Sequence, residues 1–93
     1  MSEYVTVEVE YGDDRNIAEL YINQVLTGEG AEHYENPAAG DLGSPIAQML
    51  FAAVEGIKSL TISEDCLTIQ REPDYPWEAI IDEVRDALRD WYL

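Results

Sequence analysis

Few residues of this 93-residue chain have side chains suited to chemistry, and most of those are acidic. The chain has one cysteine, Cys66, and one histidine, His33, but 20 aspartates and glutamates. A thiolate or imidazole can serve as nucleophile, base or metal ligand, and carboxylates can transfer protons or hold hard metal ions. Each of these groups becomes a site only if neighbouring residues supply the remaining partners.

The surroundings of Cys66 disfavour a reactive thiol. Glu64 and Asp65 precede it directly, and negative neighbours destabilise a thiolate, so we expect the pKa of the thiol to be raised. A single cysteine excludes an internal disulfide and a Cys-x-x-Cys motif, and an iron–sulfur cluster normally takes four thiolates. We therefore predict that Cys66 begins a strand and packs or faces solvent; a cluster shared between two or more chains is the alternative.

His33 lies between Glu32 and Glu35, and a histidine beside carboxylates can bind iron or zinc. In a chain this acidic, however, carboxylates fall beside any histidine by chance. The favoured interpretation is a solvated histidine in a loop or an edge strand. A carboxylate-based site for iron or another metal is the alternative.

The adjacent carboxylate pairs do not form a catalytic dyad by themselves, because neighbouring side chains point apart in helices and strands. These pairs are Asp13-Asp14, Glu64-Asp65 and Asp82-Glu83. The sequence contains no GxGxxG, P-loop, HExxH or GxSxG motif and no EF-hand spacing. It therefore predicts a protein that is not an enzyme, with no catalytic, cofactor-binding or metal-binding residue assigned.

The net charge of −15 narrows the class of partner. Such a surface repels phosphate backbones and anionic lipids, which argues against nucleic-acid and membrane partners. The charge either keeps the protein solvated in a salt-rich cytoplasm, where ionic screening weakens self-repulsion, or forms an acidic docking face for a basic partner. The sequence has neither a signal-type apolar segment nor a run of about 20 apolar residues, so we expect a cytoplasmic location.

Residues 44–71 organise the elements that must position these side chains. Ser44 and Pro45 are typical of an N-cap and a first helical turn, and apolar residues then recur at three- and four-residue steps. Gly56 is expected just past the helix, where a positive φ is needed. Two strands follow, at residues 57–62 and Cys66–Arg71, and a three-residue acidic turn should pair them antiparallel.

The remaining segments complete an α+β domain. Alternation of apolar and polar residues predicts strands at residues 4–11 and Ile17–Ile22, and a short third strand is possible at residues 31–35. Residues 36–43 are expected to form a loop, and residues 76–91 a closing helix. The predicted order is ββ(β)αββα: a single domain, residues 1–93, with one antiparallel sheet of four to five strands and two helices packed on one face.

A serine-proline-x-alanine opening, an apolar helix, a glycine-x-lysine-serine turn and a tryptophan in the last helix occur together in this chain. The residues are Ser44, Pro45, Ala47, Leu50, Phe51, Gly56, Lys58, Ser59, Asp65, Thr68, Ile69 and Trp77. At these positions, over about half its length, the chain resembles the N-terminal domain of the Nfu/NifU-like iron–sulfur scaffold proteins. The first half departs from that pattern, because Glu19 stands where a lysine is common.

The resemblance implies an α+β sheet with two helices and a link to iron–sulfur cluster assembly or delivery. In that family the cluster-binding Cys-x-x-Cys belongs to a separate C-terminal domain, and this sequence ends before one. The resemblance therefore implies a non-catalytic accessory or protein-interaction module without a cofactor of its own. Its expected partners are iron–sulfur assembly proteins or client apoproteins.

Overall fold

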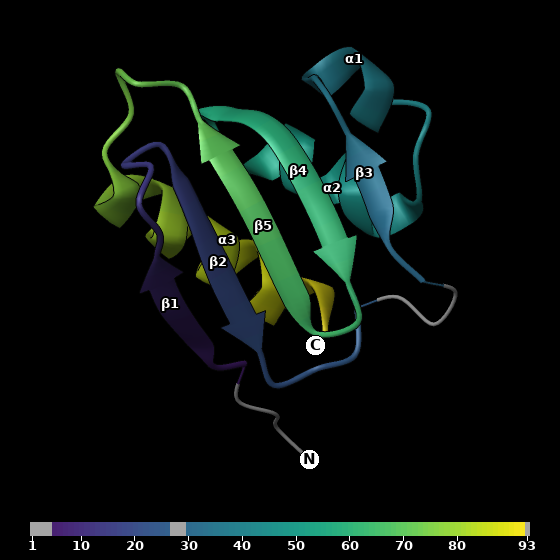
Figure 1. Ribbon diagram of the computed structural model, residues 1–93. Coiled ribbons are helices and arrows are strands. Elements are labelled where there is room, and N and C mark those ends of the chain that lie inside the picture. The colour runs from purple at the N-terminus through teal and green to yellow at the C-terminus, as the bar shows by residue number, and fades with distance from the viewer. Residues whose placement is uncertain (1–4, 27–29, 93) are drawn as a thin grey trace.

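A computed structural model describes residues 5–26 and 30–92 of the chain and contains one five-stranded antiparallel sheet. The strands lie in the order β1-β2-β5-β4-β3, with α2 and α3 behind them in Figure 1. The strands are β1 (Val7–Tyr11), β2 (Ile17–Ile22), β3 (Glu32–Tyr34), β4 (Ile57–Ser63) and β5 (Cys66–Arg71), and the helices are α1 (Pro37–Gly40), α2 (Pro45–Ala53) and α3 (Trp77–Trp91). The predicted fold class, an α+β domain with a single antiparallel sheet, is confirmed.

Two hairpins, far apart in the sequence, meet in the middle of the sheet. β1 and β2 pair from Val7↔Ile22 to Tyr11↔Ala18, and β4 and β5 pair up to Ser63↔Cys66. β2 then pairs with β5, which places Leu20 opposite Leu67. Strands β2 and β5 have the bounds that their alternating patterns predict.

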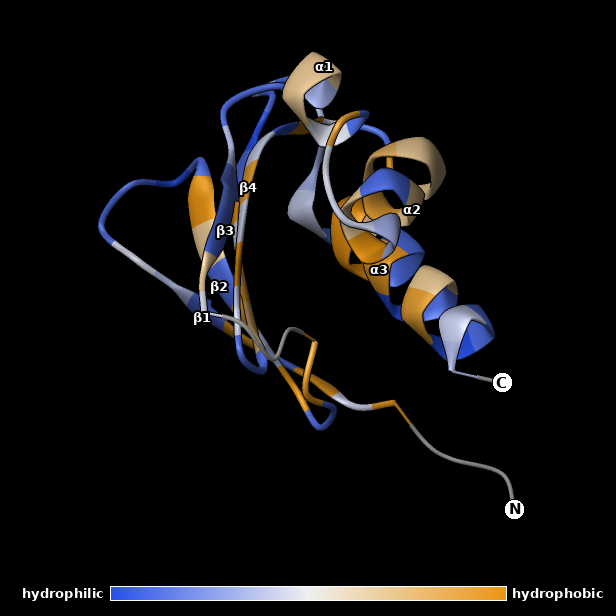
Figure 2. Ribbon diagram, turned by 90° about the vertical axis from the view of Figure 1, so that its right-hand side faces the viewer, coloured by the Kyte–Doolittle hydropathy of each residue, from blue (hydrophilic) through white to orange (hydrophobic). Residues whose placement is uncertain are grey.

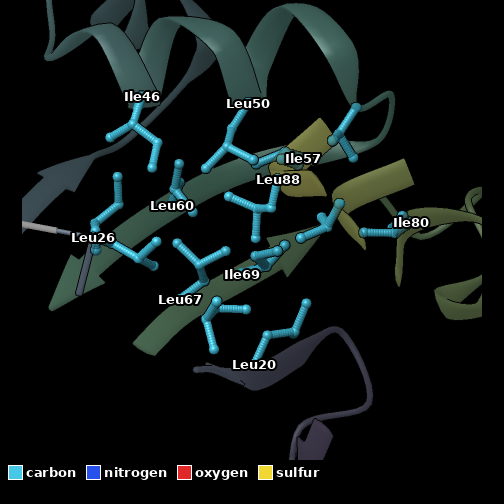
Figure 3. Close-up of a cluster of buried hydrophobic side chains, with 14 of the residues drawn as sticks. Leu20, Leu26, Ile46, Leu50, Ile57, Leu60, Leu67, Ile69, Ile80 and Leu88 are labelled. Atoms are coloured by element: carbon cyan, nitrogen blue, oxygen red, sulfur yellow. The ribbon is translucent and has the colours of Figure 1, made fainter. Parts of the chain in front are cut away.

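The core fills the space between the sheet and the two longer helices. Figure 2 shows both helices on one side of the sheet, with apolar residues turned toward the interface. In Figure 3, Leu50 of α2 and Leu88 of α3 point toward Leu60, Leu67 and Ile69 of the strands, and all five side chains are fully buried. Burying one such side chain stabilises the fold by about 1.5–3 kcal/mol, so this layer is the main source of stability.

Helix α2 begins as its sequence predicts but ends earlier. The Ser44 hydroxyl accepts a hydrogen bond from the Ala47 amide at 3.3 Å, and Pro45 occupies the first turn. The C-cap is Val54 in an extended conformation, so Gly56 lies in the following turn and not directly after the helix. Gly56 does adopt the expected positive φ, 92°. It also lies against the Tyr75 ring, where a Cβ atom would clash.

Three other predicted boundaries are wrong. The turn between β4 and β5 has two residues and not three, because Ser63 pairs with Cys66 and extends the ladder. Glu64 enters this tight turn with φ of 51°, a left-handed conformation. At the start of α3, Pro76 is the N-cap in an extended conformation, so the helix begins at Trp77. Strand β1 begins at Val7, later than the predicted start at residue 4: residues 5–6 are not part of the strand, and Tyr4 lies outside the described residues.

The segment before α2, for which the sequence predicts a loop, contains the short helix α1. The Asn36 side chain caps it by accepting a hydrogen bond from the Ala39 amide at 2.8 Å, and Pro37 supplies the preset φ of a first turn. Gly40 packs against the Phe51 ring so closely that a side chain would not fit. The cap signal of Asn-Pro was therefore present in the sequence. In the part of the chain that the structure describes, no helix is long and apolar enough to cross a bilayer.

Candidate functional site

The face of the sheet turned away from the helices is open and polar. Residues paired across antiparallel strands point to the same side, so the registers define rows of side chains on this face. One row is formed by Glu8, Tyr21, Cys66 and Ser63, and the next by Glu10, Glu19, Thr68, Thr61 and His33. Cys66 and His33, the thiol and the imidazole considered in the sequence analysis, therefore lie on the same surface.

Negative charge gathers at the β1–β2 end of this open face. Glu10 lies directly opposite Glu19, and like charges in that position are destabilising. The Tyr21 hydroxyl donates a hydrogen bond to Glu19 Oε1 at 3.4 Å. The pKa of Tyr21 is raised above its usual value, mainly by the negative charge of Glu19 and next by burial. This end of the face therefore favours positively charged groups.

A shallow depression of about 340 Å³ lies in the same region. Its lining residues come from β1, β2 and the turns beside them: Thr6, Glu8, Glu10, Tyr21, Ile22, Asn23 and Asp65. The volume is at the low end for small-molecule sites, which are usually apolar. Three carboxylates and a phenol in its lining fit the end of a lysine or arginine side chain better than an apolar ligand.

Cys66 lies half-buried on β5, in the same row of side chains as Glu8 and Tyr21. Its thiol pKa is raised mainly by burial and further by Glu19 and Asp65, while a hydrogen bond with the Thr68 side chain acts in the opposite direction. The predicted direction of the shift is thus confirmed, although burial outweighs the acidic neighbours. A thiol held protonated is a poor nucleophile and a poor metal ligand.

His33 lies in edge strand β3, which agrees with the favoured interpretation of this residue. Its Nδ1 is 2.7 Å from the Thr61 hydroxyl. The sheet order separates β3 from β5 by two strand spacings, roughly 10 Å, so His33 and Cys66 are not brought together. Within residues 5–26 and 30–92, no three histidine, cysteine or acidic side chains gather closely enough to hold a metal ion.

One cluster that the sequence did not indicate joins the first hairpin to α3. The Arg71 guanidinium lies 5.5 Å from the centroid of the Trp77 ring, and Arg71 Nε donates a hydrogen bond to Asn16 Oδ1 at 3.2 Å. Trp77 Nε1 donates to the Arg15 carbonyl at 2.8 Å, and the Tyr11 ring packs edge-on against the indole. These contacts fix the position of the β1–β2 hairpin and therefore of the acidic face. Residues 62 positions apart meet here, so no local spacing could predict it.

Fold and surface together define a small α+β domain that covers one face of its sheet with helices and leaves the other free. The family model described as "Scaffold protein Nfu/NifU N terminal" matches residues 3–93. The chain therefore belongs to the Nfu/NifU N-terminal domain family. No curated protein sequence matches the chain.

Solved structures with the same fold include proteins from yeast and from a bacterium. The NifU-like protein from Saccharomyces cerevisiae has a TM-score of 0.72 at 22% sequence identity, and the match covers 94% of this chain and 77% of that one. Protein SAV1430 from Staphylococcus aureus has a TM-score of 0.70 at 16% identity, covering 92% of this chain and 99% of that one. At such low identity the backbone arrangement is shared, while the surface residues of this chain have to be interpreted on their own.

Proposed function

We propose that this domain is a non-catalytic interaction module that docks an iron–sulfur assembly protein or a client apoprotein, while the cluster itself is held by the partner. Membership of the Nfu/NifU family links the chain to iron–sulfur cluster assembly and to assembly proteins in general. The open sheet face supports the finer role, because it presents a polar, strongly acidic surface that the fold does not use for its own packing.

This proposal rests on the number of thiolate ligands that the chain offers to an iron–sulfur cluster. These 93 residues contain one thiol, and its raised pKa opposes metal binding. Cluster sites normally use four thiolates, so the residues present do not fit a cluster. Cys66 and His33 lie on strands β5 and β3, which are not neighbours in the sheet, so the thiol and the imidazole do not form a nucleophile–base pair. The cluster is therefore cargo that the partner carries.

Anaerobic reconstitution tests the absence of a cluster site. The purified domain and its Cys66→Ser variant are incubated with ferrous iron and sulfide, desalted, and measured for visible absorbance and bound iron. Both proteins should emerge colourless and free of iron. A brown, stable chromophore on the wild-type domain that is lost in Cys66→Ser would contradict the proposal and support a cluster shared between chains.

Affinity capture under anaerobic conditions tests the docking role. The wild-type domain should recover iron–sulfur assembly proteins or cluster-containing clients, identified by mass spectrometry. Glu8→Gln/Glu10→Gln should reduce their recovery. The matched control, Glu78→Gln/Asp90→Asn, removes the same amount of charge from exposed positions of α3 and should not. Recovery of no such protein by the wild-type domain would count against the proposed function.

The alternative function is carboxylate-based binding of iron, for which the described part of the chain provides no ligand group. Anaerobic titration with ferrous iron distinguishes the two functions, because saturable binding at micromolar metal would favour the alternative. We further propose that the domain works in the cytoplasm. A reporter fusion of the native gene, followed by fractionation, checks that location.

A further inference from the structure

We infer that the free edge of β1 is the docking site, and that its occupant is an extended partner segment in which basic and apolar residues alternate. This segment would join the sheet by strand addition beside β1. The inference rests on the proposed function and names the surface and the chemistry through which the partner is held. In Figure 1, β1 forms one border of the sheet, far from β3 at the other border.

The hydrogen-bonding pattern of the sheet shows which backbone groups of β1 face outward. The Ile22 amide donates to the Asp65 carbonyl at 2.7 Å, and the Asn16 carbonyl accepts from the Arg71 amide at 2.8 Å. Even-numbered residues of β2 therefore direct their backbone groups toward β5, and odd-numbered residues direct theirs toward β1. Glu8 and Glu10, opposite Tyr21 and Glu19, bond to β2.

Val7, Val9 and Tyr11 alternate with these glutamates, so their amides and carbonyls point away from β2. The Thr6 amide donates a hydrogen bond to Asn23 Oδ1 at 3.0 Å. This fits the alternation, because the backbone amide of Thr6, like those of Glu8 and Glu10, points toward the β2 side. Among the described residues, β1 pairs with β2 alone. The outer edge of β1 thus offers a regular row of backbone donors and acceptors.

The β1 edge lacks most of the features that usually protect an edge strand. It contains no proline and no lysine, and its five residues pair with β2 without a bulge. The opposite border differs, because β3 has only three residues and contacts α1. β1 is therefore the border at which another strand can add over a useful length.

The side chains beside this edge specify the occupant. Val7 and Val9 lie on the helix side and are only half-buried, so apolar residues of an added strand would complete their cover. Glu8 and Glu10 lie on the open face beside the depression, where lysine or arginine side chains would pair with them. Because side chains of a strand alternate between faces, the partner segment must alternate basic with apolar residues.

A second copy of the chain does not fit this edge. Pairing two β1 edges would place Glu8 and Glu10 of one copy close to the same glutamates of the other. Like charges across adjacent strands are destabilising, and each copy carries a net charge of −15. The glutamates therefore protect the edge against self-association while leaving it complementary to a basic segment.

A synthetic peptide of four Lys-Val repeats, capped at both ends, serves as the probe. Binding is measured by amide chemical shifts and by hydrogen exchange of the domain near physiological ionic strength. The amides of Val7, Val9 and Tyr11 should gain protection. A peptide in which glutamate replaces lysine is the charge control and should not bind. Two further peptides carry N-methyl groups at every valine or at every lysine. Both keep the side chains, but each lacks the backbone donors along one of the two edges of the peptide strand. One of these two should lose binding and the other should keep it.

Variants of the domain test the same geometry. Val7→Pro removes an outward amide at the first residue of the strand, where proline is best tolerated, and should weaken peptide binding about tenfold. Val7→Ala keeps the amide and is the matched control for the lost side chain. If Val7→Pro does not fold, judged by circular dichroism, Glu8→Gln/Glu10→Gln replaces it and should weaken binding, while Glu78→Gln/Asp90→Asn should not.

Three results would overturn the inference: no binding of the Lys-Val peptide, binding without protection of the three amides, or equal binding of both N-methylated peptides. The inference and the proposed function can fail separately. If the peptide adds to β1 but capture recovers no iron–sulfur protein, only the proposed function fails. If capture succeeds equally well with wild type and folded Val7→Pro, only the strand-addition site fails.

Discussion

Cys66 illustrates at the level of a residue how a strand sets the chemistry of a side chain. From the sequence, only Glu64 and Asp65 are visible beside the thiol. The fold adds Glu10 and Glu19 from two other strands and also buries the thiol in part. Partial burial and the acidic neighbours thereby favour the protonated form of the Cys66 thiol.

We predict that iodoacetamide alkylates Cys66 slowly at neutral pH and that the rate rises with a midpoint above the ordinary thiol pKa of 9.0. Glu19→Gln removes one of the negative charges that raise this pKa, so its midpoint should move to lower pH. Glu78→Gln, on α3, should leave the profile unchanged. The pH dependence of the alkylation rate measures both effects, and equal shifts in the two variants would refute the local explanation.

Alkaline stability should follow from the same shifts. The pKa values of Cys66 and Tyr21 are raised in the folded state, so each group favours folding fully below its unfolded pKa, ordinarily 9.0 and 10.0. That contribution is lost as the pH rises through the folded-state value. The urea midpoint should therefore fall as the pH rises past 9, and Cys66→Ala should reduce the fall. A midpoint that rises with pH in this range would show that the sign is wrong.

At the level of elements, Trp77 at the start of α3 contacts the β1–β2 hairpin and so joins the helix to this edge of the sheet. Trp77→Phe keeps the aromatic ring but removes the hydrogen bond to the Arg15 carbonyl and weakens the interaction with Arg71. We predict a loss of about 1–2 kcal/mol in the free energy of unfolding, measured with urea.

The matched control for this change is Trp91→Phe, because Trp91 ends α3 and is 42% exposed. That variant should stay within about 0.5 kcal/mol of wild type. If the two substitutions have equal effects, Trp77 does not fasten the hairpin to the helix.

The elements were predicted well where periodicity is strong and less well at their ends. Alternation located β2 and β5 correctly, and the Ser44-Pro45 signal located the start of α2. Helix α1 has four residues, too few for a periodic pattern, so its signal in the sequence is limited to the Asn36 cap and the proline that follows it. The length of the β4–β5 turn depends on Glu64 adopting a left-handed φ, which a sequence pattern does not indicate for glutamate.

At the level of the whole molecule, the candidate surface could be predicted only in part, because it depends on the order of the strands in the sheet. Alternation shows that Glu8, Glu10 and Glu19 face away from the core. It does not show that β2 pairs with β5, and this pairing is what places Cys66 beside Tyr21. The order of strands depends on contacts between distant segments, so the rows of side chains on the open face emerge only from the fold.

The net charge of −15 should make the stability of the whole domain depend on salt. Mutual repulsion of the carboxylates weakens as the Debye length shortens, from roughly 10 Å at 0.1 M to about 3 Å at 1 M. We predict that the melting temperature rises with potassium chloride into the molar range. The rise should be smaller in Glu10→Lys, which removes the Glu10–Glu19 repulsion.

Thermal unfolding followed by circular dichroism measures this dependence. Sucrose at matched osmolarity controls for general exclusion of the solute from the protein surface. A melting temperature that stays flat or falls with salt would exclude charge repulsion as a main limit on stability.

The central pairing of β2 with β5 also has a consequence for synthesis of the chain on the ribosome. The β1–β2 hairpin leaves the exit tunnel first, but its partner strand is completed only about 50 residues later, at Arg71. At about 5–20 residues per second, the nascent hairpin waits roughly 2–10 seconds with both borders uncovered. During that interval the glutamates of β1 should repel other nascent copies of the chain. The same charges that would bind a basic partner would therefore also reduce aggregation during synthesis.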